Sequence, residues 1–420
     1  MKSRLVALIY ALLVAVLFFF RPGPPVAPRG MRPFPCPYST MLAICSDIDG
    51  TTPDEFEAYH KYLNTERDTQ MGQGLGLDVG DSFWMYMGGD SGADADSKGR
   101  GQDAVMTWFE GVSDTPKNAK LIAYYFKRGW IDAIHSYGDF SRDDTTDTRF
   151  SRALAEQAAT ALSARDVFPT VWINHGNEAN TQNFEIGSRV SYRQGARPGT
   201  PFYHADITIP AGIKFIWFSD NDKRFGRHNI LYPVTLADGR KVWGFRRYTA
   251  DWSTHGLHMQ LCDANLDYCT AIGAPVIVTQ HLGGGSTYHP LGTAARQALL
   301  GLAARQGRGE ILVARTSRLL EYLRVRDHLV FAVSHGQTVD ILGVDDPQLG
   351  YDPSPTLDML RGMTFYVQDK DTASIRVGGE PVDEALLVRA GDETGRDTIG
   401  IAWFAPDVRN YLWGARDFRH

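Results

Sequence analysis

The chain has 420 residues, a 43% hydrophobic content and a formal net charge of −6. This length indicates one large domain of about 250–300 residues with a smaller one beside it. Charged residues at 22% and aromatic residues at 11% are ordinary globular values, which excludes wholesale disorder. The acidic balance and the lack of a long basic run argue against a nucleic-acid partner. No pattern in the sequence indicates the oligomeric state.

Residues 1–21 predict a membrane anchor. Lys2 and Arg4 precede an unbroken apolar run from Leu5 to Phe20, and Arg21 follows it. A helix of this length rises about 24 Å, which approaches the roughly 30 Å of a bilayer core. Because no small-residue cleavage signature follows, we expect an uncleaved signal anchor with the rest of the chain on the extracytoplasmic side. A start at Met31 would instead make the protein cytosolic.

Composition divides the rest of the chain into three parts. Residues 22–40 are rich in proline and predict a stiff linker. Residues 41–335 alternate apolar runs typical of buried strands with helical patterns. This alternation indicates a parallel sheet whose functional groups gather at the carboxyl ends of its strands. Residues 336–420 show short apolar runs between turn residues and predict a small β-rich region.

The expected elements of the α/β part are, in chain order, strand 41–46, helix 56–63, helix 117–128, strand 130–135, helix 150–162, strand 170–174, strands 214–218 and 242–245, helix 256–271, strand 275–279, helix 315–326 and strand 329–333. The start of the first helix is well specified. Thr52 can cap it, and Pro53 suits its first position.

Polar residues follow several of these strands. Asp47 and Asp49 flank one apolar residue after the first strand. Two carboxylates there call for a cation or a shared proton, unless one of them only caps the next helix. His135 and Asp139 follow the strand 130–135, and an imidazole and a carboxylate on one loop suit zinc or another divalent transition metal. We therefore predict Asp49, His135 and Asp139 as metal ligands.

A third polar group follows the strand 170–174. His175, Asn177 and Asn180 are predicted to bind substrate, because amide side chains can both donate to and accept from sugar hydroxyl groups. The alternative interpretation is that these residues only form a turn that asparagine stabilises, without binding substrate.

The last candidates lie nearer the C-terminus. Arg246 is predicted to orient a catalytic carboxylate and Arg247 to bind substrate, although either arginine could fill the first role or form an ordinary ion pair. Trp252 offers an aromatic face to a sugar ring. His281 follows the strand 275–279 and is a candidate general acid for the leaving group.

Two families share motifs with this sequence. Asp47-Ile48-Asp49-Gly50-Thr51 resembles the nucleophile motif of the haloacid-dehalogenase-like phosphatases. That resemblance implies Asp47 as a nucleophile toward phosphorus and Asp49 as acid and base, with magnesium. Asp220 and Asp222 stand where that family has paired acids, but no lysine lies at a suitable distance before them.

Over residues 41–333 the chain resembles the NodB-like polysaccharide deacetylases, metal-dependent enzymes that remove acetyl groups from amino sugars. Ser46 to Gly50 stands at the acidic motif of that family, His135 to Asp139 at its HSxxH motif, and His281 at its last strand. The chain departs from the family where Ile48 separates the two aspartates and where Asp139 replaces the second histidine.

The deacetylase resemblance implies an α/β fold, a (β/α)7-type barrel. Outside this barrel, the sequence predicts a C-terminal β-rich appendage and an N-terminal transmembrane helix. The resemblance also implies a hydrolase of carbon–nitrogen bonds other than peptide bonds, which removes an acyl group from a cell-envelope or exported glycan. Asp47 would act as base and His281 as acid beside zinc or a similar metal. The alternatives are a magnesium phosphatase and a glycan-binding barrel without catalysis, which the missing second histidine favours.

Overall fold

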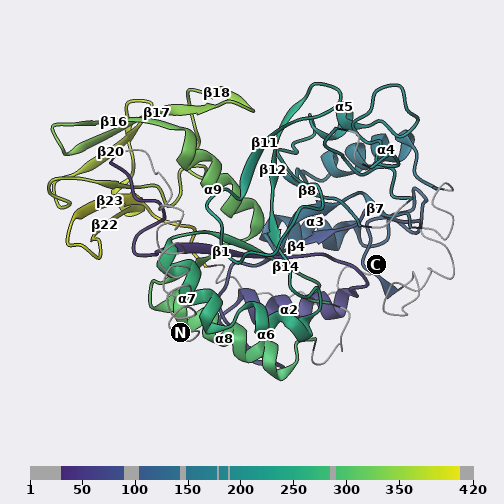
Figure 1. The fold of residues 1–420 in the computed structure, drawn as a ribbon, viewed down its shortest axis with the longest axis horizontal. Coiled ribbons are helices and arrows are strands. Elements are labelled where there is room, and N and C mark those ends of the chain that lie inside the picture. The colour runs from purple at the N-terminus through teal and green to yellow at the C-terminus, as the bar shows by residue number, and fades with distance from the viewer. Residues whose placement is uncertain are drawn as a thin grey trace, which may run out of the picture.

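A computed structural model describes residues 30–88, 104–141, 148–176, 179–187, 190–283 and 290–406. These ranges form one large curled sheet with helices packed around it and a separate β-rich region at the C-terminal end (Figure 1). In this view α2, α6, α7 and α8 lie below the sheet, while α4 and α5 lie above it on the right. α9 lies between the sheet and the β-rich region.

The main sheet has eleven strands and is almost entirely parallel. Ten strands follow the order β10-β13-β14-β1-β4-β6-β8-β9-β12-β11, and β15 pairs with β1 beside this path. Only the β11–β12 pair is antiparallel among the described strands of this sheet. The strands are β1 (Thr40–Ser46), β4 (Gly80–Phe83), β6 (Ile131–His135), β8 (Val171–Ile173), β9 (Phe215–Trp217), β10 (Asn221–Asp222), β11 (Leu231–Thr235), β12 (Lys241–Phe245), β13 (Arg247–Tyr248), β14 (Val276–Gln280) and β15 (Ile311–Val313).

The predicted (β/α)7-type barrel is wrong, because this sheet curls without closing. Two stretches of chain contribute strands near both ends of this order. One runs from β9 through Ser219 to β10, and the other runs from β12 through Arg246 to β13. Ser219 has a φ of 71°, so the chain bends sharply there. Beyond the bends β10 and β13 are only two residues long, and β13 pairs with β14 at one position alone among the described residues, so the sheet is narrow at this end.

The last strand expected in the α/β part, over residues 329–333, also lies elsewhere. β16 (Leu329–Ser334) pairs with β17 (Thr338–Asp346) in the C-terminal region. β15 lies against the first half of β1 instead, where Leu42 faces Val313. None of the expected strands covers β15, which has three residues.

The helices are α2 (Pro53–Asn64), α3 (Ala119–Arg128), α4 (Arg152–Ser163), α5 (Ala205–Thr208), α6 (Leu257–Gln260), α7 (Asp263–Ile272), α8 (Thr293–Gly307) and α9 (Thr316–His328), with short 3-10 helices η2 (Thr254–Gly256) and η3 (Glu384–Leu386). α2 begins at Pro53, as the local signals predict. The Thr52 side chain accepts from the backbone of Glu55, and the Glu55 carboxylate accepts from the backbone of Thr52. This capping box fixes the chain directly after the turn that carries Asp49.

The C-terminal region consists of two small sheets. The first contains β16, β17, β18 (Gly350–Asp352), β20 (Ser374–Val377) and β21 (Glu380–Pro381), and the second contains β19 (Thr364–Tyr366), β22 (Leu387–Gly391) and β23 (Asp397–Ile401). Two-residue pairs elsewhere are β2 (Asp68–Thr69) with β3 (Gly72–Gln73) and β5 (Tyr86–Met87) with β7 (Gly138–Asp139).

The C-terminal region shares a hydrophobic core with one face of the main sheet. Leu319 and Leu323 of α9 belong to the same buried cluster as Val339 of β17 and Phe365 of β19. Buried Asp346 accepts hydrogen bonds from Arg324 at 2.8 Å and from the indole of Trp243. The predicted boundary between residues 335 and 336 falls in the turn between β16 and β17.

The membrane expectation is corrected as well. In the ranges that the structure describes, no helix combines the length and the apolar character needed to cross a bilayer. The segment 1–21, on which the prediction of an anchor fell, lies outside the described residues. Membrane attachment, and the extracytoplasmic location that was inferred from it, are therefore withdrawn.

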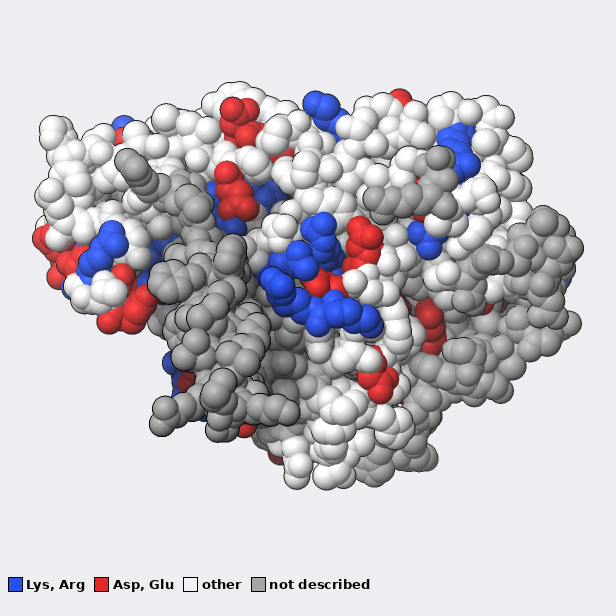
Figure 2. All heavy atoms as spheres, in the orientation of Figure 1, with Lys and Arg blue, Asp and Glu red and all other residues white. Residues whose placement is uncertain are grey.

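Charges on the visible face are mixed. Lys and Arg side chains gather near the centre of this face, with Asp and Glu side chains among them (Figure 2). Among the described residues, this face carries no extended surface of a single sign.

Candidate metal centre

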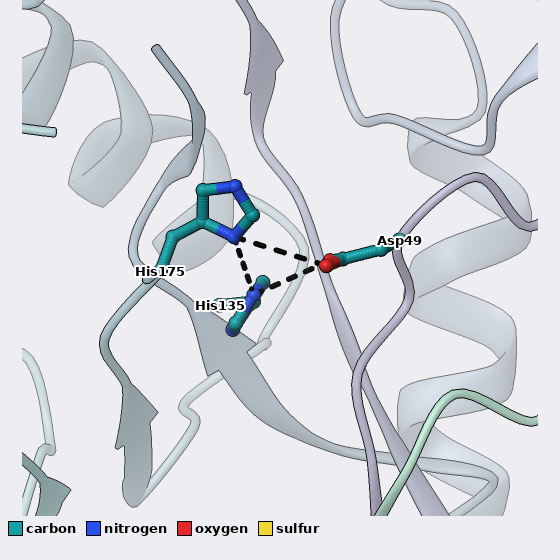
Figure 3. Close-up of side chains that lie close together, drawn as sticks. All are labelled: Asp49, His135 and His175. Atoms are coloured by element: carbon teal, nitrogen blue, oxygen red, sulfur yellow. Dashed lines mark hydrogen bonds and ion pairs between the residues drawn. The ribbon is translucent and has the colours of Figure 1, made fainter. Parts of the chain in front are cut away.

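Three side chains at or just after the ends of β1, β6 and β8 converge at one edge of the main sheet, where β4 lies between β1 and β6. Asp49 lies in the turn after β1, His135 is the last residue of β6, and His175 follows β8. Parallel strands end at the same edge, which brings their following residues together. His135 Nε2 lies 2.9 Å from His175 Nδ1 and 3.3 Å from Asp49 Oδ1, and His175 Nδ1 lies 3.9 Å from Asp49 Oδ2 (Figure 3).

The donor set fits a divalent transition metal. One ligand atom from each of the three residues lies within 4.8 Å of the other two. Two imidazole nitrogens and one carboxylate oxygen are ligands that suit zinc and its neighbours. Three protein ligands leave coordination positions for water and substrate, which is the pattern of catalytic rather than structural sites.

Asp139 orients one of these ligands instead of joining them. Its Oδ1 lies 3.2 Å from Nε2 of His175, and the same oxygen accepts a hydrogen bond from the Ser141 backbone at 2.8 Å. A carboxylate on the outer nitrogen of a metal-binding histidine fixes the tautomer and the angle of the ring. The structure thus brings together the predicted Asp49 and His135 but places His175, predicted for substrate, where Asp139 was expected.

His135 is held differently from His175. Its ring stacks on the buried indole of Trp84, with centroids 6.0 Å apart and planes 12° apart. Its Nδ1 is buried and has no hydrogen-bond partner within the described ranges. The outer side of the His135 ring is therefore held by packing against Trp84, while the outer nitrogen of His175 is held by the carboxylate of Asp139.

Opposite charges within the cluster shift the pKa values of His175 and Asp49 in opposite directions. Burial alone would lower the pKa of His175, but the carboxylates of Asp139 and Asp49 outweigh it and raise that pKa to about 9. Burial would raise the pKa of Asp49, but His135, His175 and His281 hold it well below its usual range. At neutral pH the metal-free site therefore holds a charged Asp49 beside a protonated His175.

This charge state predicts the pH dependence of metal binding. His175 Nδ1 must lose its proton before it can bind a cation, so each metal ion bound below pH 9 displaces a proton. Apparent affinity should fall about tenfold for each pH unit below that value and level off above it. Calorimetric titration with zinc in buffers of different ionisation heat measures the released proton. Binding with no proton release at pH 7 would contradict this charge state.

A second prediction concerns Asp139→Asn. The amide removes the charge that raises the pKa of His175, so proton competition should become weaker and the pH profile should move to lower pH. Measured above pH 9 in a chelator-buffered titration, where that competition is absent, zinc affinity should still fall about 10–100-fold, because the ring loses its orienting partner. An affinity at high pH equal to that of the wild type would show that Asp139 does not position the ring.

A buried ion pair lies beside the cluster. Arg247 donates to both carboxylate oxygens of Asp47, at 2.8 and 3.0 Å, and both side chains are buried. The guanidinium also lies over the ring of Trp217, 3.6 Å from its centroid. Arg247 therefore fills the role predicted for Arg246 and is not exposed to substrate.

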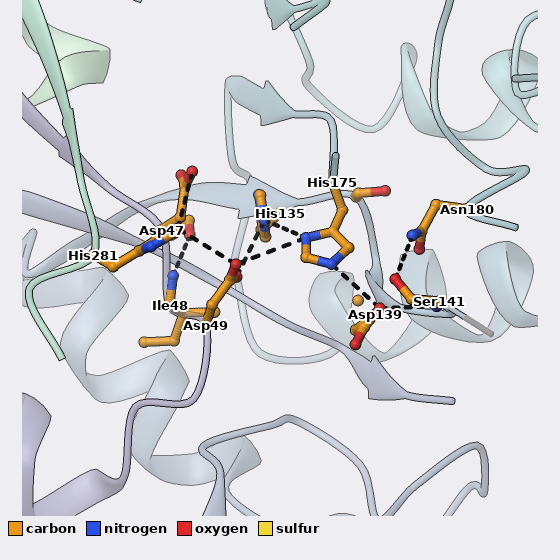
Figure 4. Close-up of polar contacts among 12 residues, drawn as sticks. Asp47, Ile48, Asp49, His135, Asp139, Ser141, His175, Asn180 and His281 are labelled. Carbon is orange, nitrogen blue, oxygen red and sulfur yellow. Dashed lines mark hydrogen bonds and ion pairs between the residues drawn. The ribbon is translucent and has the colours of Figure 1, made fainter. Parts of the chain in front are cut away.

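His281 lies on the other side of Asp49 from the two histidine ligands. Its Nε2 is 3.4 Å from Asp49 and 4.0 Å from Asp47 (Figure 4). Its backbone donates to Trp252, whose ring stacks on the imidazole with centroids 5.8 Å apart. Trp252 is 37% exposed, so one part of this stack faces solvent.

Other predicted residues lie away from the cluster. Arg246 donates to the backbone of Asn229 and lies over Tyr232. Asn180 is fully buried, accepts from the backbone of Phe140 and donates to Ser141. Asn177 lies outside the described residues.

No family model matches the chain, and no curated protein or solved structure matches it either.

Proposed function

We propose that the protein is a metal-dependent hydrolase that removes an acyl group from an amino sugar within a glycan. The observation that carries this proposal is the position of Asp47 and His281 beside the cluster of Asp49, His135 and His175. A carboxylate and an imidazole that are not ligands stand next to three side chains that fit a metal. Hydrolysis of an amide requires those two additional groups, one to accept and one to donate a proton.

Each residue of the site has a task in this proposal. Asp49, His135 and His175 would hold the ion, and a bound divalent metal supplies Lewis acidity and a water of lowered pKa. Asp47 accepts the proton of the attacking water, and Arg247 keeps its carboxylate in place. His281 donates a proton to the nitrogen of the leaving amine.

The exposed part of Trp252 supports a carbohydrate substrate. An aromatic ring beside the proton donor gives an apolar face on which a sugar ring can lie while its polar groups remain solvated. Trp217 lies behind it, with centroids 6.2 Å apart, so the platform is backed by a second indole. The glycan itself stays unspecified.

The geometry favours this reaction over the phosphatase alternative. Asp220 and Asp222, which resemble the paired acids of the phosphatases, hydrogen-bond with Tyr232 and pair with Arg227. They therefore have partners of their own, away from Asp47.

The test is release of acetate from N-acetylglucosamine oligomers by the zinc-loaded full chain, followed by mass spectrometry of the sugar. Asp47→Asn and His281→Ala should each reduce the rate about 10²–10⁴-fold while metal content is retained. His258→Ala is the matched control, because His258 is exposed and bonded only locally to the His255 carbonyl. A metal-loaded protein that releases no acyl group from N-acetylated or O-acetylated oligomers would refute the proposal.

A further inference from the structure

His135 is followed by a turn that must hold an unusual shape. Ser136 and Tyr137 come directly after His135 and have φ values of 57° and 61°. Positive φ is uncommon outside glycine, and two such residues in succession persist only where surrounding contacts fix them. His175 lies two residues beyond the end of β8.

One asparagine joins this turn to His175. The Oδ1 of Asn183 accepts from the Ser136 hydroxyl at 2.5 Å and from the His175 backbone N–H at 3.1 Å. Its Nδ2 donates to the backbone carbonyl of His175. A single amide side chain thus bonds the residue after one ligand and both backbone polar groups of the other.

The asparagine is itself held firmly. Asn183 is fully buried, its N–H donates to the Asn180 carbonyl, and its carbonyl accepts from the Gly195 N–H. Gln182, also fully buried, donates to the Ser136 hydroxyl and to the Gly138 carbonyl. Hydrogen bonds of both backbone and side chains therefore hold the segment that carries Asn183 in place beside the metal ligands.

We infer that Asn183 is a positioning residue that sets the distance between His135 and His175. This inference rests on the proposed metal centre and deepens it. The side chain is too deeply buried to touch substrate, and its hydrogen bonds go to the Ser136 hydroxyl and the His175 backbone. It acts through the backbone that carries those rings, where an error of a few tenths of an ångström would spoil the geometry of the two nitrogens. Its two acceptor contacts hold the Ser136 hydroxyl and the His175 N–H, and its donor contact holds the His175 carbonyl.

Cobalt titration of the full chain tests this role, because the visible spectrum of bound Co²⁺ reports both affinity and ligand geometry. Asn183→Ala should weaken Co²⁺ binding about 10–100-fold and change the shape of the spectrum. Asn183→Asp keeps the acceptor oxygen but replaces the Nδ2 donor by a carboxylate oxygen that faces the His175 carbonyl, so it should also weaken Co²⁺ binding and change the spectrum. Ser136→Ala, which removes one contact from the opposite side, should shift both quantities in the same direction by less.

Asn64→Ala is the matched control. Asn64 is also a buried asparagine, and it bonds His60 and the Val79 carbonyl far from His135 and His175. Its loss should affect stability but leave the Co²⁺ spectrum and affinity unchanged. If Asn183→Ala does not fold, Asn183→Asp and Ser136→Ala carry the test alone.

The outcomes distinguish the metal centre from the positioning role of Asn183. Wild-type protein that binds no Co²⁺ overturns the metal centre and this inference with it. Wild-type protein that binds Co²⁺, with Asn183 and Ser136 variants that match it in affinity and spectrum, overturns the positioning role alone. Equal losses in Asn183→Ala and Asn64→Ala would also overturn it, because they would reflect stability only.

Discussion

Replacing His175 by alanine is expected to abolish tight metal binding. Structural zinc sites bind with about 10–16 kcal/mol shared among four ligands, so one ligand accounts for roughly 3–4 kcal/mol, or about 10²–10³-fold in affinity. The change also removes the group that pairs with Asp139 and helps to neutralise Asp49. Chelator-buffered zinc titration of the full chain measures the loss.

His204→Ala is the control for that experiment. His204 is equally buried and bonds Thr208 and the Gln182 carbonyl, but it does not belong to the metal cluster. Burial lowers its pKa to about 4, so it is a neutral core histidine. Metal binding should survive its loss. A His175→Ala protein that binds zinc as tightly as the wild type would remove His175 from the ligand set.

Replacing Arg247 by methionine is expected to destabilise the fold by about 3–5 kcal/mol, because Asp47 becomes a buried carboxylate without a countercharge. The contact of the guanidinium with Trp217 is lost in the same step. Urea unfolding followed by circular dichroism gives the free energy of unfolding. The double variant Asp47→Leu with Arg247→Met should lose less than the sum of the single variants, because it leaves no unpaired charge.

The neighbouring arginine provides the control. Arg246→Met removes only a half-buried contact with Tyr232 and a bond to a backbone carbonyl, and should cost about 1 kcal/mol or less. Equal destabilisation by the two substitutions would mean that the pair with Asp47 contributes nothing special to the fold.

Local patterns predicted the elements better than their assembly. Thr52 and Pro53 fix the start of α2 through contacts within one turn, so sequence alone identifies it. The helix expected over 256–271 is broken between α6 and α7 at Leu261 and Cys262. The failure to close a barrel depends on the bend at Ser219 and on the pairing of β16 with β17, and neither is encoded in a local pattern.

The candidate site shows the same limit. Strand-end position was enough to select Asp49, His135 and His175, but not to decide which side chains face one another. Asp139 looked like a ligand because of its spacing from His135. The turn at Ser136 and Tyr137 instead carries it to the outer nitrogen of His175.

The same holds for the residues around the ligands. Arg246 lies between β12 and β13, and Arg247 is the first residue of β13, so the choice between them depended on which side chain faces inward. Asn183 carried no signal in the sequence, because it lies in the long segment between β8 and α5, away from any expected strand end.

The most direct test of the metal centre is the metal content of the purified full chain, measured by inductively coupled plasma mass spectrometry for wild type beside His135→Ala and His204→Ala. Bound zinc or a similar transition metal near one ion per chain, lost in His135→Ala and kept in His204→Ala, is the expected result. Wild-type protein that holds no metal after incubation with zinc, or a His135→Ala protein that holds as much as wild type, would contradict a site built from Asp49, His135 and His175.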